Sequence, residues 1–162
     1  ANTFIDLIDE ATDNTKDGQI GSGSRMGVVS FSNTAVANTQ LITSVDALKA
    51  AVDGLSAGGS TNHADAFAKA IQLFDPASSN AKVMVMFTDG NTTIGAPPAP
   101  VAAAARAQGI IIYCIGLIGS DGLDISALNN WATDPDASHV AVTPDAASWA
   151  VSASSVVRRG LT

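Results

Sequence analysis

One acidic residue, Asp89, lies where a buried strand is predicted to end. The residues before it, 83–87, are an unbroken run of Val, Met and Phe, typical of a strand covered on both faces in a parallel sheet. In open α/β sheets, ligands bind beyond the carboxyl ends of the strands. Asp89 is therefore placed where chemistry is expected, and a solvated turn is the alternative interpretation.

The elements around Asp89 alternate between strand and helix patterns. Strands are predicted at residues 26–31, 82–87, 110–118 and 139–142, with a weaker strand at 40–43, at an edge, after a turn bracketed by Asn33 and Asn38. Helices are predicted to begin near residues 3, 44, 62, 101 and 126. This alternation implies right-handed crossovers and an α/β fold, a doubly wound, mostly parallel open sheet with helices on both faces.

Finer local features can be predicted from the same patterns. Thr3 is expected to cap the first helix, and Leu55 is expected to face inward from the second. His139 is expected to begin the last strand. Residues 146–162 form a thin amphipathic pattern, which predicts a divergent C-terminal helix.

Composition limits the possible functions. With 162 residues, 46% of them hydrophobic, the chain has the size and core of one domain. Its net charge of -7 argues against nucleic acid or an anionic membrane surface as the partner. The only cysteine, Cys114, lies in an apolar run and is expected to be a buried, inert thiol.

Four segments occur in an order and at separations that resemble a known family. They are residues 26–32, 58–62, 87–90 and 113–116. Together they resemble the von Willebrand factor type A domain, from the first helix to about Asp145. The resemblance implies a doubly wound, Rossmann-like sheet with one short antiparallel edge strand.

The resemblance also implies a metal-ion-dependent adhesion site. By motif, its threonine ligand is Thr61 and its third-loop aspartate is Asp89, which would hold Mg²⁺, or Mn²⁺ or Ca²⁺, with a position left for an acidic side chain of a protein partner. Thr61 also suits an N-cap. The rim of the ligand pocket is expected to include Ser32, Asn33, Asn62, His63 and Gly90.

The chain departs from the family at the first loop, which should carry Asp-x-Ser-x-Ser. Ser22 and Ser24 imitate that loop, but Ile20 stands in place of the aspartate. We therefore expect residues 1–162 to be a single domain truncated at its N-terminus. A missing central strand predicts a hydrophobic slot beside strand 26–31, and a weakly held cation.

The leading hypothesis is thus a protein-binding module of the cell-adhesion type and not an enzyme, because no catalytic constellation is recognisable near Asp89. The alternative is a Mg²⁺-dependent phosphotransfer enzyme of the haloacid dehalogenase type. That class requires Asp-x-Asp, whereas the chain has Asn91 at the second position after Asp89 and Phe87 at the second position before it. The resemblance favours a secreted or cell-surface location without excluding the cytoplasm.

Overall fold

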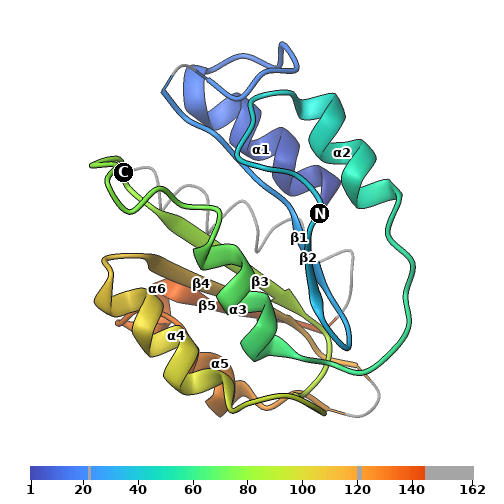
Figure 1. The fold of residues 1–162 in the computed structure, drawn as a ribbon. Helices are drawn as coiled ribbons and strands as arrows, with labels where there is room; N and C mark the ends of the chain where they lie inside the picture. The colour runs from blue at the N-terminus through green and yellow to red at the C-terminus, as the bar shows by residue number, and fades with distance from the viewer. Residues whose placement is uncertain (22, 120–121, 145–162) are drawn as a thin grey trace.

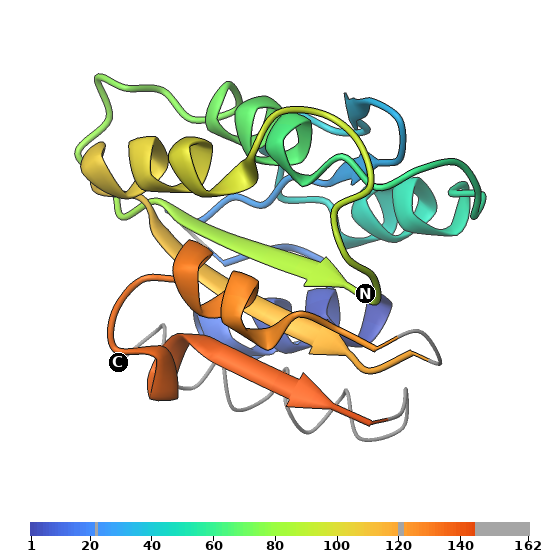
Figure 2. The same cartoon turned by 90° about the horizontal axis from the view of Figure 1, so that it is seen from below.

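Three parallel strands form the main sheet. The computed structural model describes residues 1–21, 23–119 and 122–144. The strands lie in the order β3 (Val83–Thr88), β4 (Ile111–Leu117) and β5 (Val140–Thr143), and all three point in one direction (Figure 2). The predicted strands 82–87 and 110–118 are confirmed. Their continuous apolar runs suit strands that are covered on both faces of a sheet.

A separate antiparallel pair consists of β1 (Val29–Phe31) and β2 (Ala35–Ala37). The sequence prediction of an edge strand at 40–43, and of a turn between Asn33 and Asn38, was wrong. The second strand lies inside that interval, while residue 42 makes only an isolated bridge to Met26. One reason is a long-range contact, since the Ala35 amide donates a hydrogen bond of 2.6 Å to the Asp65 carboxylate.

Three helices cover one face of the main sheet. They are α3 (His63–Ile71), α4 (Pro98–Ala107) and α5 (Ile125–Trp131). Their buried residues form one hydrophobic core with the side chains of β3 and β4 that point to this face: Ala66, Phe67, Ala102, Ala105, Leu128 and Trp131 pack with Met84, Met86, Ile112 and Cys114. Cys114 is buried, as expected, and this burial raises the pKa of its thiol to about 12, which disfavours the reactive thiolate.

The opposite face is covered by α1 (Asn2–Asp13), and α2 (Val45–Asp53) packs beside α1 (Figure 1). The Phe4 ring meets the edge of Phe87, with ring centroids 5.3 Å apart. Tyr113 and Ile115 complete this second core. Helices on both faces make the sheet doubly wound, as the strand and helix pattern predicts.

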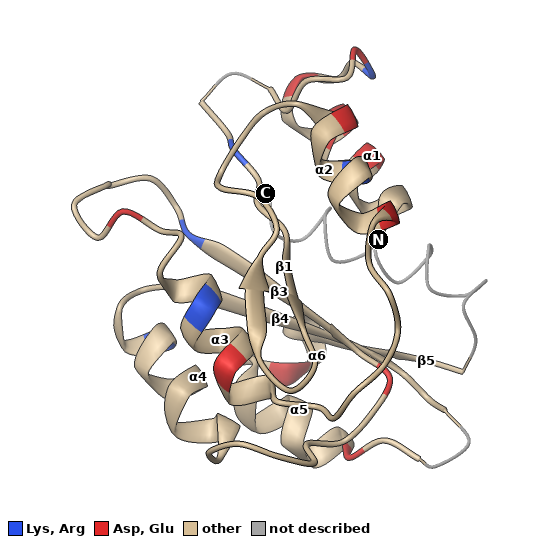
Figure 3. Ribbon diagram, turned by 45° about the vertical axis from the view of Figure 1, so that its right-hand side comes forward, with Lys and Arg blue, Asp and Glu red and all other residues tan. Residues whose placement is uncertain are grey.

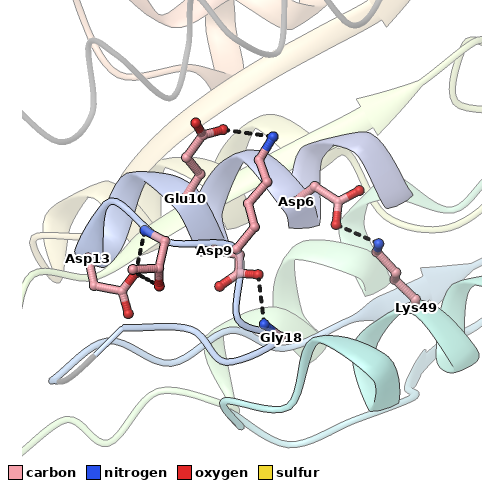
Figure 4. A network of polar contacts seen from close by, with 8 residues as sticks. Asp6, Asp9, Glu10, Asp13, Gly18 and Lys49 are labelled. Carbon is pink, nitrogen blue, oxygen red and sulfur yellow. Dashed lines mark hydrogen bonds and ion pairs between the residues drawn. The ribbon is translucent and has the colours of Figure 1, made fainter.

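Polar contacts of α1 with its surroundings are shown in Figure 4. Asp6 pairs with Lys49 of α2, and Glu10 pairs with Lys16. Asp9 differs because it is 2% exposed and accepts a hydrogen bond from the Gly18 amide at 3.2 Å. This buried carboxylate holds the loop after α1, a role that the amphipathic pattern of the helix did not predict.

Three local predictions were wrong. Thr3 lies inside α1, whose N-cap residue is Ala1 without a side-chain cap. Leu55 lies beyond the end of α2 and is exposed. His139 ends a short helix, α6 (Asp136–His139), rather than beginning β5. The predicted C-terminal helix at 146–162 lies outside the described residues.

Charged side chains lie on the helices and loops and not on the described strands (Figure 3). Among the described residues, no helix is both long and apolar enough to cross a membrane. In the described part of the chain, β1 pairs with β2 and β3 pairs with β4, and β1 and β3 are not paired with each other.

Candidate metal centre

The predicted site residues gather where β1 and β3 end and α3 begins. The Asn62 amide donates a hydrogen bond to the Ser32 carbonyl at 3.0 Å. The next residue, His63, forms a hydrogen bond of 2.8 Å through Nε2 with Thr88 Oγ1 at the end of β3. The carboxyl ends of β1 and β3 therefore both lie at the N-terminus of α3.

Thr61 is held by its backbone, which leaves its side chain available. Its amide donates to Thr93 Oγ1 at 2.7 Å, and its carbonyl accepts from the Thr93 amide at 3.0 Å. Asn62, and not Thr61, is the N-cap of α3, since its side chain accepts from the Asp65 amide at 3.1 Å. The Thr61 hydroxyl therefore has no hydrogen-bond partner among the described residues.

Asp89 stands exposed at the tip of the loop after β3. The Thr88 hydroxyl donates to the Gly90 carbonyl at 3.1 Å and so closes the turn that presents Asp89. A methyl group in place of the Gly90 hydrogen would lie 4.0 Å from Thr61 Oγ1. The Thr61 hydroxyl thus faces the backbone next to Asp89, across the edge of the sheet.

Asn33, in the loop after β1, holds the loop that precedes α3. Asn33 Oδ1 accepts from the Ser60 amide at 2.7 Å, and the Asn33 carbonyl accepts from Asn62 Nδ2 at 3.0 Å. Ser32 is half-buried and Asn33 is exposed. The loop after β1 and the loop before α3 are therefore joined by hydrogen bonds next to Thr61.

His63, which was predicted at the rim, is instead completely buried. Its ring lies 4.8 Å from that of Trp131 and 5.2 Å from that of Phe31, centroid to centroid. The Thr88 hydroxyl proton is directed to a carbonyl, so Nε2 donates to Thr88 and Nδ1 accepts from the Thr92 hydroxyl at 2.8 Å. Burial lowers the pKa of His63 to about 4, which keeps the ring neutral.

The polar residues after Asp89 act as a scaffold that the sequence reading missed. Thr92 holds His63, Thr93 holds Thr61, and Asn91 Oδ1 accepts from the Asp124 amide at 2.7 Å. The signal available in the sequence was the polar run 91–93 directly after the predicted strand end. These residues connect the loop after β3, by hydrogen bonds, to the residues at the start of α3 and to the beginning of α5.

Gly95 lies against the cap of α3 and offers a test of this scaffold. Its φ is +91°, and a Cβ atom there would overlap the side-chain amide of Asn62. We expect Gly95→Ala to lower the free energy of unfolding by about 1–2 kcal/mol from backbone strain, with a further loss from displacing Asn62. Gly109→Ala is the matched control in urea denaturation, because Gly109 has φ +81° but open space around it. Equal losses in the two variants would contradict the Asn62 contribution.

The atoms at this edge of the sheet that could coordinate a cation are oxygen atoms. Both ring nitrogens of His63 are taken by hydroxyl groups, which leaves the Asp89 carboxylate and the Thr61 hydroxyl. Within the described ranges, no three His, Cys, Asp or Glu side chains come together as a metal site. The chemistry fits a hard cation that keeps several waters, and the single carboxylate fits weak binding.

Comparison with known proteins identifies the fold family. A family model described as the von Willebrand factor type A domain matches residues 4–154. The chain belongs to the von Willebrand factor type A (VWA) family. The resemblance inferred from the four sequence segments is confirmed. No curated protein sequence gives a significant match to the chain.

Solved VWA structures share the fold at low identity. Proximal thread matrix protein 1 from the mussel byssus, with a zinc-occupied MIDAS motif, has a TM-score of 0.80 and 22% identity over 98% of this chain and 40% of that chain. A von Willebrand factor type A protein from Catenulispora acidiphila has a TM-score of 0.76 and 23% identity, covering 96% and 35%. The vWF domain of the pili tip protein Mfa5 from Porphyromonas gingivalis has a TM-score of 0.79 and 11% identity, covering 99% and 87%.

These likenesses establish the VWA fold, an open sheet of the Rossmann-like type. The chain spans about two fifths of the length of the mussel protein and less of the Catenulispora protein. The family that matches is VWA and not the haloacid dehalogenase class considered from the sequence. At these identities the likeness shows the fold alone.

Proposed function

We propose that this VWA domain holds a divalent cation between Thr61 and Asp89 and uses it to bind an acidic group of a protein partner. The observation that carries the proposal is the Thr61 hydroxyl. It does not cap α3, and it faces Gly90 beside the exposed Asp89 carboxylate. A zinc-occupied MIDAS motif in the mussel neighbour supports it.

Each group has a separate part in this proposal. Asp89 supplies the negative charge, and Thr61 supplies a neutral oxygen, so the charge of a divalent cation is only half compensated. When bound, the cation offers a coordination position to a carboxylate of the partner. Thr93 joins the loop after β3 to the backbone of Thr61, and Asn33 holds the neighbouring Ser60, so less of the Thr61 backbone has to be ordered on binding.

Oxygen donors favour Mg²⁺, Mn²⁺ or Ca²⁺ over metals that prefer imidazole or thiolate. One carboxylate is a small ligand set, so we expect a dissociation constant of about 10⁻³ M, the weak end of the range for protein Ca²⁺ sites. Asp89→Ala should weaken Mn²⁺ binding by about tenfold or more, because it removes the only charged ligand. Thr61→Ala should weaken it less.

Mn²⁺ titration followed by electron paramagnetic resonance measures this affinity directly. Asp46→Ala is the matched control, since Asp46 is an exposed carboxylate on α2 and its loss changes the net charge equally. An Asp89→Ala variant that binds Mn²⁺ as tightly as the control would remove Asp89 from the site. Mg²⁺-dependent hydrolysis of p-nitrophenyl phosphate that requires Asp89 would instead favour a phosphotransfer enzyme.

A further inference from the structure

The loop that follows α1 carries oxygen-bearing side chains at a spacing that suits calcium. Residues 13–18 read Asp-Asn-Thr-Lys-Asp-Gly. The first half of the EF-hand calcium loop is Asp-x-[Asp/Asn]-x-[Asp/Asn]-Gly, in which alternate side chains and the backbone carbonyl after the glycine are ligands. Here Thr15 supplies a hydroxyl at the third position, and Ser24 stands where the EF-hand has its last glutamate. The spacing is therefore a partial match, and the structure has to decide.

The backbone of the loop has the shape that this spacing needs. Gly18 takes a φ of +85°, which suits the sharp turn made by the glycine of a calcium loop. The Ile20 amide then donates to the Thr43 carbonyl at 2.8 Å and anchors the end of the turn. The Gln19 carbonyl, which follows the glycine, has no hydrogen-bond partner among the described residues. It remains available as a ligand.

The two carboxylates of the loop each use one oxygen to hold the turn. Asp13 Oδ1 accepts from the amide and the hydroxyl of Thr15, at 3.0 Å and 2.6 Å. Asp17 Oδ1 accepts from the Gln19 amide at 2.9 Å. The second oxygen of each has no partner in the part of the chain that the structure describes, and both side chains are exposed. Turns of this kind also form without an ion, so they supply ligands but do not decide the question.

The deciding observation is Asp9, which lies one helical turn before Asp13 on the same face of α1. Asp9 is 2% exposed, and its Oδ2 accepts from the Gly18 amide at 3.2 Å, so the carboxylate lies against the loop (Figure 4). Its Oδ1 is buried and has no hydrogen-bond partner in the described structure. A buried carboxylate oxygen is strongly unfavourable unless a donor or a cation compensates it.

The basic side chains nearby are engaged elsewhere. Lys16, within the loop, pairs with Glu10 at 3.0 Å, and Lys49 of α2 pairs with Asp6. Among the described residues, Asp9 forms no ion pair. The positive charge that would compensate its free oxygen therefore has to come from outside the chain.

The geometry points to a calcium site: we propose that this loop binds Ca²⁺ through the carboxylates of Asp9, Asp13 and Asp17, the hydroxyl of Thr15 and the carbonyl of Gln19. Ca²⁺ accepts many oxygen ligands in flexible geometry, whereas Mg²⁺ demands a near-ideal octahedron. No three acidic side chains already converge in the described ranges, so the exposed Asp13 and Asp17 turn toward the fixed Asp9 as the ion binds.

This calcium loop shares no residue with the candidate metal centre at the sheet edge, and it does not depend on the function proposed there. The turning of two side chains and the loss of the last glutamate both weaken binding. We therefore expect a dissociation constant of about 10⁻⁴ to 10⁻³ M, the range of extracellular calcium modules.

Titration of the ¹⁵N-labelled Asp89→Ala variant with Ca²⁺ tests the calcium loop alone, because this variant lacks the carboxylate proposed as a ligand at the sheet edge. We expect saturable chemical-shift changes at the amides of Thr15, Gly18 and Gln19 below about 10 mM Ca²⁺. Mg²⁺ at the same concentrations should change these amides much less. Failure of the site at Thr61 would leave these results unaltered.

Asp9→Asn keeps an oxygen for the Gly18 amide but removes the buried charge, and should weaken Ca²⁺ binding about tenfold or more. Asp17→Asn, at an exposed position, should also weaken it without disturbing the core. Asp6→Asn is the matched control, since it removes the same charge from the same helix and should leave the affinity unchanged. Absence of shifts at about 10 mM Ca²⁺, equal shifts with Mg²⁺, or equal losses in Asp6→Asn and Asp9→Asn would overturn the proposal.

Discussion

Lowering the pH from 7 to about 4 is expected to remove about 3 kcal/mol of folding stability through His63 alone. The ring is 0% exposed, lies between Phe31 and Trp131, and has a pKa of about 4 against an ordinary value of 6.5. Each pKa unit corresponds to about 1.4 kcal/mol, so this difference makes His63 a strongly pH-sensitive group of the fold.

The sign follows from which state binds the proton. Between pH 6.5 and pH 4 the unfolded chain protonates His63, while the folded chain keeps the ring neutral. The unfolded state therefore binds more protons, and stability rises with pH in this window. The contribution is complete above about pH 6.5 and is lost progressively as the pH falls through 4.

Urea denaturation at several values between pH 7 and pH 4 measures this slope. His63→Gln keeps a side chain that can hydrogen-bond to Thr88 but does not titrate, so its stability should fall less steeply with acid. His139→Gln, which removes the other histidine, is the matched control. If the slopes of His63→Gln and the unaltered chain coincide, the buried neutral ring is not the cause.

The central strands could be predicted from the sequence because a continuous apolar run by itself indicates burial on both faces. Residues 83–87 and 111–117 need no distant partner to be recognised as buried. Two helix caps also rest on local contacts, unlike the wrongly predicted cap at Thr3: Ser44 accepts from the Ala47 amide at 3.2 Å, and Asp124 accepts from the Ala127 amide at 3.1 Å. Both are contacts between residues three positions apart.

What the sequence did not predict depends on distant contacts. Strand β2 is a short Ala-Val-Ala segment, and its Ala35 amide is held by Asp65, thirty positions away. His63 looked like a surface residue at a helix N-terminus, but Trp131, far along the chain, covers it. A polar residue that is buried by its partners leaves no local hydrophobic pattern.

The candidate site divides in the same way. Thr61 and Asp89 were proposed as cation ligands from their motifs, and the hydrogen bonds that join their loops are consistent with that assignment, which stays a prediction. The support of the site came from residues without a recognisable motif, since Thr92 and Thr93 bind side chains and backbone about thirty positions earlier. Motifs identify the groups that do chemistry, whereas the groups that position them depend on the fold.

Phe67→Ala is expected to lower the free energy of unfolding by about 3–5 kcal/mol, a large part of the total stability of an ordinary domain. Phe67 is 0% exposed at the centre of the core between α3 and the sheet. Its ring meets the edge of Trp131 with centroids 5.7 Å apart, and Trp131 in turn covers His63. Truncation leaves a cavity beneath both rings.

The effect of Phe67→Ala should also reach the sheet edge, because Trp131 would lose one of the rings that hold it over His63. Phe74→Ala is the matched control, since the same atoms are removed from a half-buried ring just after α3 and the loss should be smaller. Thermal and urea unfolding give the two losses, and the His63 ring resonances report whether its hydrogen bonds persist. Equal losses would mean that the core relaxes around Phe67 and that Trp131 is held by its backbone instead, where the Arg106 guanidinium donates to its carbonyl at 2.6 Å.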